Sequence, residues 1–439
     1  MLVLCSLCIS VPKLPARFEE IVMHAPLRRR EFFKASSAAA VGIALPEAPA
    51  AAQGVAKSPE NFHLVGAPVL QGVSESSAAI VWAVNDTSTG WVEYGTTEAL
   101  GQKAQAGDCG LMALDPIVHK VRLTGLAPAT KYFYRVYAAP IAFLGPYDIR
   151  RGRPFASPIY SFTTLDTGRG AETTFSVIND THETKETLTP LLGRLKAEPT
   201  AMTFWNGDMF DDIRSESHLA EQLLVPAGLA YATESPVYFT RGNHDVRGAG
   251  ARHLSKFVDT PNGLPYYSFR QGPVAFICLD TGEDKPDDHP VYAGLSDFAA
   301  YRLEQRGWLA KELARDHIRT ASFRVVVAHI PMYEAAGRTR QRPVDPYGGT
   351  GVGGGADARA KWHDLLVKAG IDLIIAGHTH RYAFLEADAT RPFAQLTGGG
   401  PRPEAATLIQ GRATTNELVV MMTKLDGTSI GRYTFNRRT

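Results

Sequence analysis

Residues 237–245 read VYFTRGNHD and residues 373–380 read LIIAGHTH, and the two stretches share one pattern. Each begins with a short, mainly apolar run that is typical of a buried β-strand. Each then continues into glycine, histidine and other polar residues. Because ligands in α/β sheets bind at the carboxyl ends of the strands, these two polar tips mark the expected functional site.

Three further polar tips follow apolar runs in the same way: DTH at 180–182, GD at 207–208 and AH at 328–329. The D-x-H pattern alone is uninformative, because the chain holds a second one at Asp287 and His289. G-N-H-D, by contrast, is expected far less than once by chance in 439 residues with 40 Gly and 13 His. The ordered series therefore predicts one site assembled from several strands.

An alternation of apolar strands and helical segments surrounds these tips and predicts an α/β domain over residues 170–435. Strands are expected at 175–178, 201–205, 237–240, 274–279, 323–328 and 373–376, and helices at 297–315 and 358–368. After residue 382 the pattern returns to short β-like runs, which end with 417–423 and 429–435.

Residues 61–165 show a different pattern, in which short alternating runs are separated by turn residues. The strongest segment is HKVRLTGLAPATKYFYRVY at 119–137, where Gly125 and Pro128 separate two alternating strands. The segment resembles the fibronectin type III sandwich, so an all-β domain is expected. Its position also resembles that of the amino-terminal domain of purple acid phosphatases. A scaffold beside the site is favoured over a binding role.

The series of strand-end motifs resembles that of the calcineurin-like metallophosphoesterases over residues 170–435. This resemblance implies a β-sandwich flanked by helices, with a two-metal centre at the strand ends. It implies one metal held by Asp180, His182 and His380, and a second metal held by Asn243, His329 and His378. Asp208 would bridge both metals.

The same resemblance places His244 beside the substrate rather than on a metal. Its expected role is to protonate the leaving group, with Asp245 behind it to orient the imidazole ring. Arg247, Tyr333 and Arg381 stand next to motif residues and are further candidates for substrate contact.

The mixture of imidazole, carboxylate and amide ligands favours Mn, Fe, Zn or Co over Mg or Ca, and leaves the identity of the metals open. The expected reaction is hydrolysis of a phosphate ester by a hydroxide that bridges the two metals. Phosphomonoesters are the favoured substrates, and nucleotide or glycerophosphodiester substrates are the alternative. A further alternative is an inert surface-binding protein, against which the intact ligand set argues.

Position 211 departs from the purple acid phosphatases. Those enzymes have a tyrosine three residues after the bridging aspartate, where it binds ferric iron and gives the colour, whereas this chain has Asp211. His182 is instead the ligand of the non-purple branch. The resemblance to purple acid phosphatases is therefore expected in the small β domain and not in the metal site.

The longest expected loop, residues 331–356, contains six glycines between 348 and 355. One interpretation is a loop that cradles phosphate. A mobile lid or disordered insertion is favoured, because the lysine and the strand–loop–helix pattern of a P-loop are missing.

The first 52 residues have the order of a secretory signal peptide. Arg29, Arg30, Phe32 and Lys34 spell R-R-x-F-x-K, and an alanine-rich run and small residues follow. This order resembles the twin-arginine export signal, and a start at Met23 would give it a basic segment of ordinary length. The apolar run of about eleven residues is shorter than the roughly 20 that span a bilayer, so no permanent anchor is expected. A periplasmic or extracellular location follows.

Charge and cysteine content limit the partners. With 46 Lys+Arg against 45 Asp+Glu, the net charge of +1 provides no field for nucleic acid. The expected partners are a small phosphate-ester substrate and the twin-arginine export machinery. Four cysteines make no disulfide framework, and the two beyond the leader, Cys109 and Cys278, are expected to be buried thiols.

Overall fold

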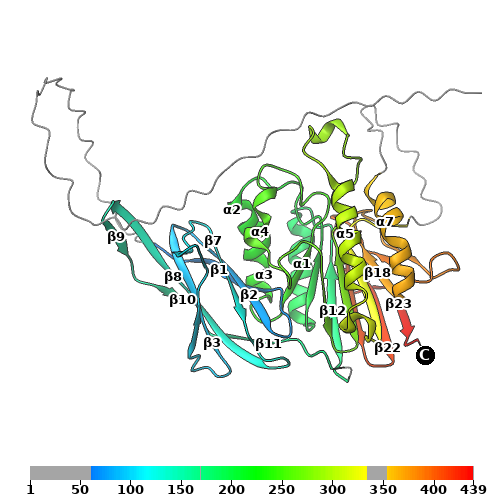
Figure 1. Ribbon diagram of the computed structural model, residues 1–439, viewed down its shortest axis with the longest axis horizontal. Coiled ribbons are helices and arrows are strands. Elements are labelled where there is room, and N and C mark those ends of the chain that lie inside the picture. Colours follow the sequence, from blue (N-terminus) through cyan, green and yellow to red (C-terminus); the bar gives the residue numbers. More distant parts are fainter. Residues whose placement is uncertain (1–60, 169, 334–352, 439) are drawn as a thin grey trace, which may run out of the picture. The chain divides into compact units, whose positions relative to one another are not determined.

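The structure is a computed structural model of the chain and describes residues 61–168, 170–333 and 353–438 (Figure 1). The expected export segment, residues 1–52, lies outside the described residues, as do positions 334–352 of the glycine-rich loop. None of the described helices is both long and apolar enough to cross a bilayer.

The regular elements within residues 61–165 are all strands. They are β1 (Leu64–Gln71), β2 (Ser77–Val84), β3 (Ser88–Gly95), β4 (Gln102–Ala104), β5 (Gly107–Asp108), β6 (Leu111–Met112), β7 (Val118–Thr124), β8 (Lys131–Gly145), β9 (Asp148–Arg151), β10 (Phe155–Ala156) and β11 (Tyr160–Thr163). The consecutive strands β7 and β8 lie in different sheets, since β7 pairs with β2 and β8 with β3. Trp82, Val121 and Tyr134 are buried in the core that the two sheets share, as expected for a sandwich.

The remaining chain alternates strands and helices. The strands are β12 (Thr173–Ile178), β13 (Thr203–Asn206), β14 (Val237–Thr240), β15 (Tyr267–Gln271), β16 (Val274–Leu279), β17 (Phe323–Ala328), β18 (Leu373–Ala376), β19 (Ala383–Leu385), β20 (Ala394–Thr397), β21 (Thr407–Ala413), β22 (Glu417–Lys424) and β23 (Ser429–Asn436). The α-helices are α1 (Lys185–Ala197), α2 (Glu216–Leu219), α3 (Val225–Ala230), α4 (Leu254–Phe257), α5 (Phe298–Glu312), α6 (Asp316–Arg319) and α7 (Gly354–Ala369). Shorter helical turns are η1 (Ala220–Leu224), η2 (Ala251–His253) and η3 (Pro290–Tyr292).

Two sheets form the centre of this α/β part. One has the order β23-β22-β21-β12-β13-β14-β1-β2-β7, and the other has the order β15-β16-β17-β18-β20-β19. Strands β12, β13 and β14 run parallel in the first sheet, and β16, β17, β18 and β20 run parallel in the second. Each parallel group therefore brings several carboxyl ends to one edge.

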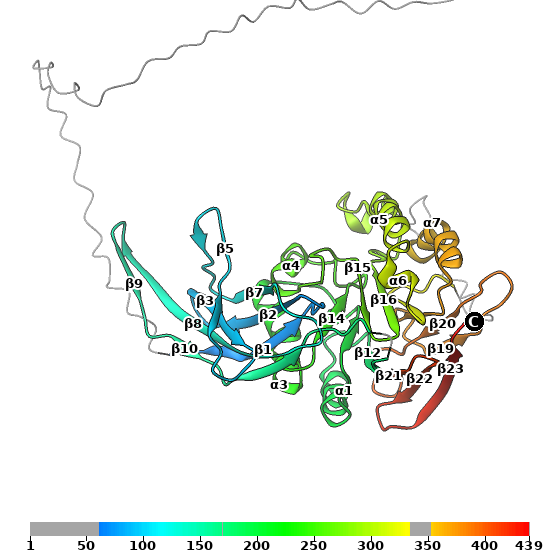
Figure 2. The same cartoon turned by 60° about the horizontal axis from the view of Figure 1, so that its bottom comes forward.

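The two sheets pack face to face, and helices cover their outer faces (Figure 2). Between the sheets, the ring of Phe175 on β12 packs edge-on against Phe276 on β16, with ring centroids 5.1 Å apart. Leu191 of α1 belongs to an apolar cluster on the first sheet, and Leu309 of α5 and Trp362 of α7 belong to one on the second. The predicted β-sandwich flanked by helices is confirmed.

The β domain and the α/β part share a sheet. β1 pairs in parallel with β14 at Gln71 and Val237, so β1, β2 and β7 extend the nine-stranded sheet. The buried Gln71 side chain donates from Nε2 to the carbonyl oxygen of Phe257 (3.0 Å) and accepts from the Asp259 amide (2.6 Å). The sequence pattern changes near residue 165, but the hydrogen-bonded sheet continues across that change.

The expectation for the cysteines is half wrong. Cys278 is buried in β16, as predicted, whereas Cys109 is exposed in the turn between β5 and β6. In this turn Cys109 has φ 48° and precedes Gly110. Among the described residues, the Cys109 thiol has one hydrogen-bond partner, the carboxylate of the neighbouring Asp108.

Candidate metal centre

The predicted ligands all follow strands whose carboxyl ends meet at one edge of the sandwich. In the first sheet, Asp180 and His182 follow β12, Asp208 follows β13 and Asn243 follows β14; in the second, His329 follows β17 and His378 and His380 follow β18. The site is therefore assembled from both sheets, because their parallel strands end together.

One half of the cluster consists of Asp180, His182, Asp208 and His380. One ligand atom from each of them lies within 4.8 Å of the others. His380 Nε2 is 3.0 Å from His182 Nε2 and 3.4 Å from Asp180 Oδ1. His182 Nε2 is also 3.6 Å from Asp208 Oδ2.

The second half consists of Asp208, His329 and His378, again with ligand atoms within 4.8 Å of one another. His329 Nε2 lies 3.0 Å from Asp208 Oδ2. Asn243 joins this half, because its Oδ1 lies 2.7 Å from His378 Nδ1. Asp208 is the carboxylate common to both halves, which is the geometry expected of a bridging ligand.

Two orphaned atoms at the centre fit the binding of cations. Asp180 Oδ1 and His329 Nε2 are fully buried and form no hydrogen bond with the described residues. His329 Nδ1 donates to the carbonyl oxygen of Asn206 (2.8 Å), so in the neutral ring that would bind a metal the lone pair is on Nε2, which lies beside the carboxylates. Buried polar atoms without partners are costly, and a bound metal ion would satisfy both.

The electrostatics of the cluster fit the same conclusion. Burial and the charge of His329 lower the pKa of His378 to about 4, which leaves its imidazole in the neutral, ligating form. Burial would lower the pKa of His329 too, but the charges of Asp208 and Asp180 outweigh it and raise that pKa to about 10. Carboxylates that stabilise a proton at this point stabilise a cation in the same way.

Several of these residues have strained backbone. Asp180 (φ 51°), His182 (φ 45°), Asp208 (φ 53°), His378 (φ 70°) and His380 (φ 55°) all lie in the left-handed region that non-glycine residues rarely adopt. Such strain persists where the surrounding structure enforces it and gathers at functional sites. Here it turns each side chain from the strand end toward the cluster.

Glycines leave room for the ligands. A Cβ atom at Gly207 would lie 2.4 Å from His329 Nδ1, one at Gly242 would lie 2.2 Å from Asp208 Oδ1, and one at Gly377 would lie 2.4 Å from Asp180 Oδ2. Each of these glycines belongs to a motif of the sequence analysis. Their physical role is to let the backbone approach the neighbouring ligand.

The expected role of Asp245 is wrong. Its buried carboxylate accepts from the backbone amides of Gly242 (2.7 Å), Asp208 (2.8 Å) and Met209 (3.1 Å), and not from the His244 ring. Asp245 therefore holds the backbone at Asp208, the predicted bridging residue. Spacing along the chain could not reveal this, because two of the three amides lie on another loop.

His244 is oriented by other groups. Its Nδ1 lies 2.6 Å from the carbonyl oxygen of Asp211, which can only accept, so Nδ1 carries the proton. Nε2 then accepts from Nη1 of Arg247 (3.1 Å). The ring lies beside the cluster, 4.6 Å from the ring of His182, but its Nε2 has no proton to donate in this arrangement.

Asp211, the residue in place of tyrosine, contacts His182. Its Oδ1 accepts from His182 Nδ1 at 2.9 Å, which leaves the lone pair of that ring on Nε2, facing the cluster. The carboxylate orients a ligand in the way that outer carboxylates orient metal-binding histidines.

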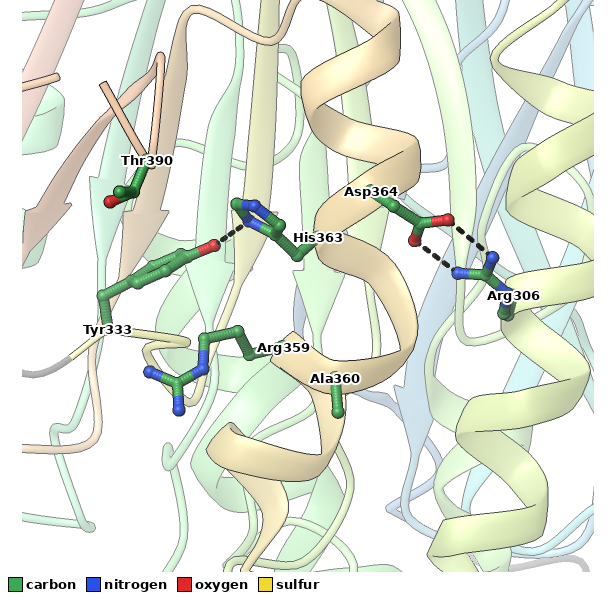
Figure 3. A pocket seen from close by; sticks show the side chains of 7 residues that line it. All are labelled: Arg306, Tyr333, Arg359, Ala360, His363, Asp364 and Thr390. Atoms are coloured by element: carbon green, nitrogen blue, oxygen red, sulfur yellow. Dashed lines mark hydrogen bonds and ion pairs between the residues drawn. The ribbon is translucent and has the colours of Figure 1, made fainter. Parts of the chain in front are cut away.

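Of the three candidate substrate residues, Tyr333 lines a different cavity, and no role is assigned to Arg381. The hydroxyl of Tyr333 points to His363 of α7 and lines a separate cavity of about 470 Å³ with Arg306 and Arg359 (Figure 3). Arg381 is exposed after the GHTH motif, and only its carbonyl oxygen has a recorded bond, from the Thr379 hydroxyl. Of these three candidates, only Arg247 has a side-chain bond, among those of the described residues, that reaches a residue beside the cluster, His244.

Sequence reasoning missed Asn179 and the glycine run 398–400. Asn179 Nδ2 donates to Asp180 Oδ2 (2.6 Å) and to the Gly399 carbonyl oxygen (2.8 Å). A Cβ at Gly398 would lie 2.0 Å from Asn179 Oδ1. The G-G-G sequence at 398–400, directly after strand β20, was the available signal.

Comparisons with known proteins agree with this geometry. Residues 173–382 match the family model of calcineurin-like phosphoesterases, and residues 59–164 match the amino-terminal domain of purple acid phosphatases. The chain thus carries a calcineurin-like phosphoesterase domain. It combines that domain with the amino-terminal β domain of purple acid phosphatases, as the sequence motifs predicted.

Similar proteins include purple acid phosphatase 18 of Arabidopsis thaliana, which is 23% identical over 340 residues covering 74% of this chain and 65% of that protein. Phosphoenolpyruvate phosphatase of Allium cepa is 23% identical over 348 residues, covering 74% of this chain and 62% of that protein. The chain thus spans slightly less than two thirds of each plant relative.

Among solved structures, the purple acid phosphatase PPD1 of yellow lupin (Lupinus luteus) seeds superposes with a TM-score of 0.61 at 16% identity, covering 84% of this chain and 74% of that chain. PhoD superposes with a TM-score of 0.54 at 12% identity, covering 85% and 92%. At these identities the likeness shows the fold.

Proposed function

We propose that this protein is a metal-dependent phosphoric ester hydrolase with a two-metal centre. The observation that carries the proposal is Asp208, the buried carboxylate shared by two ligand groups that the structure brings together from two sheets. Asp180, His182 and His380 would hold one metal, and Asn243, His329 and His378 the other. Mn, Fe, Zn and Co suit this donor set.

The residues of the chain divide the work. Two bound cations supply the Lewis acidity that activates water and neutralises charge on a phosphoryl group. Asp211 and the Asn206 carbonyl oxygen fix the tautomers of His182 and His329, so that both rings present a lone pair at Nε2. Asp245 fixes the backbone of Asp208 through two amides of the loop after β13.

Phosphomonoesters are the proposed substrates. The names of the relatives support this choice, since the onion protein is called a phosphoenolpyruvate phosphatase and two others are called purple acid phosphatases. Phosphodiesters remain the alternative, because the metal ligands do not select the ester.

The test is turnover by the purified, metal-reconstituted protein. We expect hydrolysis of an aryl phosphate monoester at a higher kcat/KM than a bis-aryl phosphodiester, and loss of both activities in the Asp208→Asn variant. A preference for the diester would assign the alternative substrate class. If two metals bind and neither ester is hydrolysed, the protein is the inert binder.

We further propose that the protein is exported by the twin-arginine route. The support is the sequence R-R-E-F-F-K at 29–34 with the alanine-rich run after it. That route carries folded proteins, which suits a centre assembled from strand ends far apart in the chain.

A further inference from the structure

A cluster of charged side chains lies beside the metal ligands and has no role in holding metal. Arg247, four residues after Asn243, forms ion pairs with Glu283 (2.6 Å) and Asp284 (2.8 Å), which follow strand β16. The hydroxyl of Tyr292 donates to Glu283 Oε2 (2.8 Å), and Lys285 pairs with Asp284 (3.1 Å). The two carboxylates are largely buried, with 4% and 11% of their side chains exposed.

The hydrogen bonds of Arg247 leave one N–H group available. Nε donates to Glu283, and Nη2 donates to Glu283 Oε2 (2.6 Å) and to Asp284 Oδ1 (2.8 Å). Nη1 donates one hydrogen to His244 Nε2 (3.1 Å). A guanidinium has five N–H donors, and the fifth, also on Nη1, has no recorded partner among the described residues. It therefore belongs to the nitrogen that already faces His244.

This nitrogen lies close to the ligand cluster. His244, which it contacts, packs its ring 4.6 Å from that of the predicted ligand His182.

Helices α5 and α7 hold the loop that carries Glu283 and Asp284. Arg302 of α5 is 2% exposed and donates to the carbonyl oxygens of Thr281 (2.8 Å) and Glu283 (2.5 Å). The Gly354 amide at the start of α7 donates to the Asp284 carbonyl oxygen (3.0 Å). Glu283 and Asp284 are thus fixed in position before any substrate binds.

We propose that Arg247 binds a phosphoryl oxygen of the substrate, and that Glu283 and Asp284 are positioning residues that aim its guanidinium at the metal centre. Carboxylates on one side of the planar guanidinium fix its orientation, and the remaining N–H and the positive charge then serve an anionic oxygen. The proposal rests on the proposed function, since it assigns a further contact for the same phosphate group.

Binding of inorganic phosphate to the metal-loaded protein tests the role of Arg247. By titration calorimetry, Arg247→Ala should raise the Kd about 10- to 100-fold, the cost of losing a charge-assisted hydrogen bond, with metal content unchanged. Arg306→Ala is the matched control, because Arg306 forms a similar pair with Asp364 (2.6 Å) between α5 and α7. It should leave the Kd unchanged. An unchanged Kd in Arg247→Ala with both metals bound would overturn the proposal.

Chemical rescue tests the positioning role. Guanidinium ion, added far below denaturing concentrations, should restore phosphate binding to Arg247→Ala, because the carboxylates that held the side chain can hold the free ion. It should fail to do so in the Arg247→Ala, Glu283→Gln double variant, and Asp284→Asn provides a second test of the same kind. Equal rescue in both backgrounds would show that Glu283 is only structural. A variant that loses its metal or its folded circular dichroism is replaced by the Asp284 variant.

Failure of this proposal differs from failure of the proposed function. If phosphate binding depends on Arg247 and no ester is hydrolysed, the phosphate contact stands and the hydrolase assignment falls. If esters are hydrolysed and the Kd for phosphate does not depend on Arg247, the hydrolase assignment stands and the phosphate contact of Arg247 falls.

Discussion

At the scale of single residues, Asp208 connects the two halves of the metal centre. Its Oδ2 faces His329 (3.0 Å) and His182 (3.6 Å), and its Oδ1 accepts from the His244 amide (2.8 Å). Two cations side by side repel each other, and a shared carboxylate offsets that repulsion with its full charge.

The Asp208→Asn variant should therefore lose bound metal together with activity. The amide keeps the shape of the side chain but removes its charge. We expect fewer than two metals per chain by elemental analysis and a loss of activity of more than about 100-fold, since even outer residues of metal sites cost 10- to 100-fold. Two retained metals with full turnover would show that Asp208 is not the bridge.

The Gly242→Ala variant should weaken the site without touching a ligand atom. The added Cβ would lie 2.2 Å from Asp208 Oδ1 and 2.4 Å from the Asp208 amide nitrogen, so the loop must shift. Gly193→Ala is the control, because that glycine lies inside α1 with open space around it and should gain roughly 0.5–1 kcal/mol of stability. Metal affinity measured by competition with a chelator should fall in the first variant alone.

The His244→Ala variant tests whether the imidazole is a general acid or only accepts a hydrogen bond from Arg247. A general acid raises the hydrolysis rate by about 10²- to 10⁴-fold. This gain is far larger for an alkyl leaving group than for an activated aryl leaving group. In the structure, Nε2 accepts from Arg247, so we expect comparable losses for alkyl and aryl phosphates, with metal content unchanged. A much larger loss for the alkyl ester would restore the role of general acid.

At the scale of secondary-structure elements, strand β1 connects the β domain to the parallel strands β12, β13 and β14 of the nine-stranded sheet. It meets β14, the strand that leads into the GNHD loop, and the buried Gln71 anchors it to the chain after α4. Further contacts cross the same boundary, such as the Tyr238 hydroxyl on β14, which donates to the Val73 carbonyl oxygen (2.7 Å).

Replacing Gln71 by alanine should destabilise both parts together. The change leaves the Phe257 carbonyl and the Asp259 amide without these partners in a buried place, at a cost of about 2 to 4 kcal/mol. Gln102→Ala, on the exposed face of β4, should stay within about 0.5 kcal/mol. Denaturant unfolding followed by fluorescence and circular dichroism measures both; separate transitions for the two parts in the parent protein would contradict a shared sheet.

At the scale of the whole molecule, the proposed export route depends on when the proposed metal centre can form. The ligands come from strands between residues 173 and 376, so the centre exists only once both sheets have formed. A protein exported unfolded would have to find its metals outside the cell.

Replacing Arg29 and Arg30 by lysine should block export of this protein. Twin-arginine signals require the arginine pair, while the net charge is preserved by lysine. Cell fractionation should show precursor trapped inside the cell, with metal already bound to it. Normal export of the variant would remove the argument for this route.

The sequence predicted the grouping of the candidate ligands wherever the signal was local, and the structure brings those residues together. Two stretches combine an apolar run with ligand-type residues over eight or nine positions: β18 with the GHTH motif after it, and β14 with GNHD. Such patterns can be recognised without knowing the rest of the fold. The ligand residues and the sandwich followed from these patterns and from a family resemblance. Side chains that act through distant partners left no such pattern.

The amino-acid sequence by itself determined the strands, the polar residues at their ends and the family to which those motifs point. Only the tertiary structure decided that Asp245 binds backbone amides of another loop, that Glu283 holds Arg247, and that β1 pairs with β14. The physical reason is the separation along the chain of the residues that interact. Apolar periodicity and ligand type are properties of a few consecutive residues, whereas a hydrogen bond between loops depends on how whole sheets and helices pack.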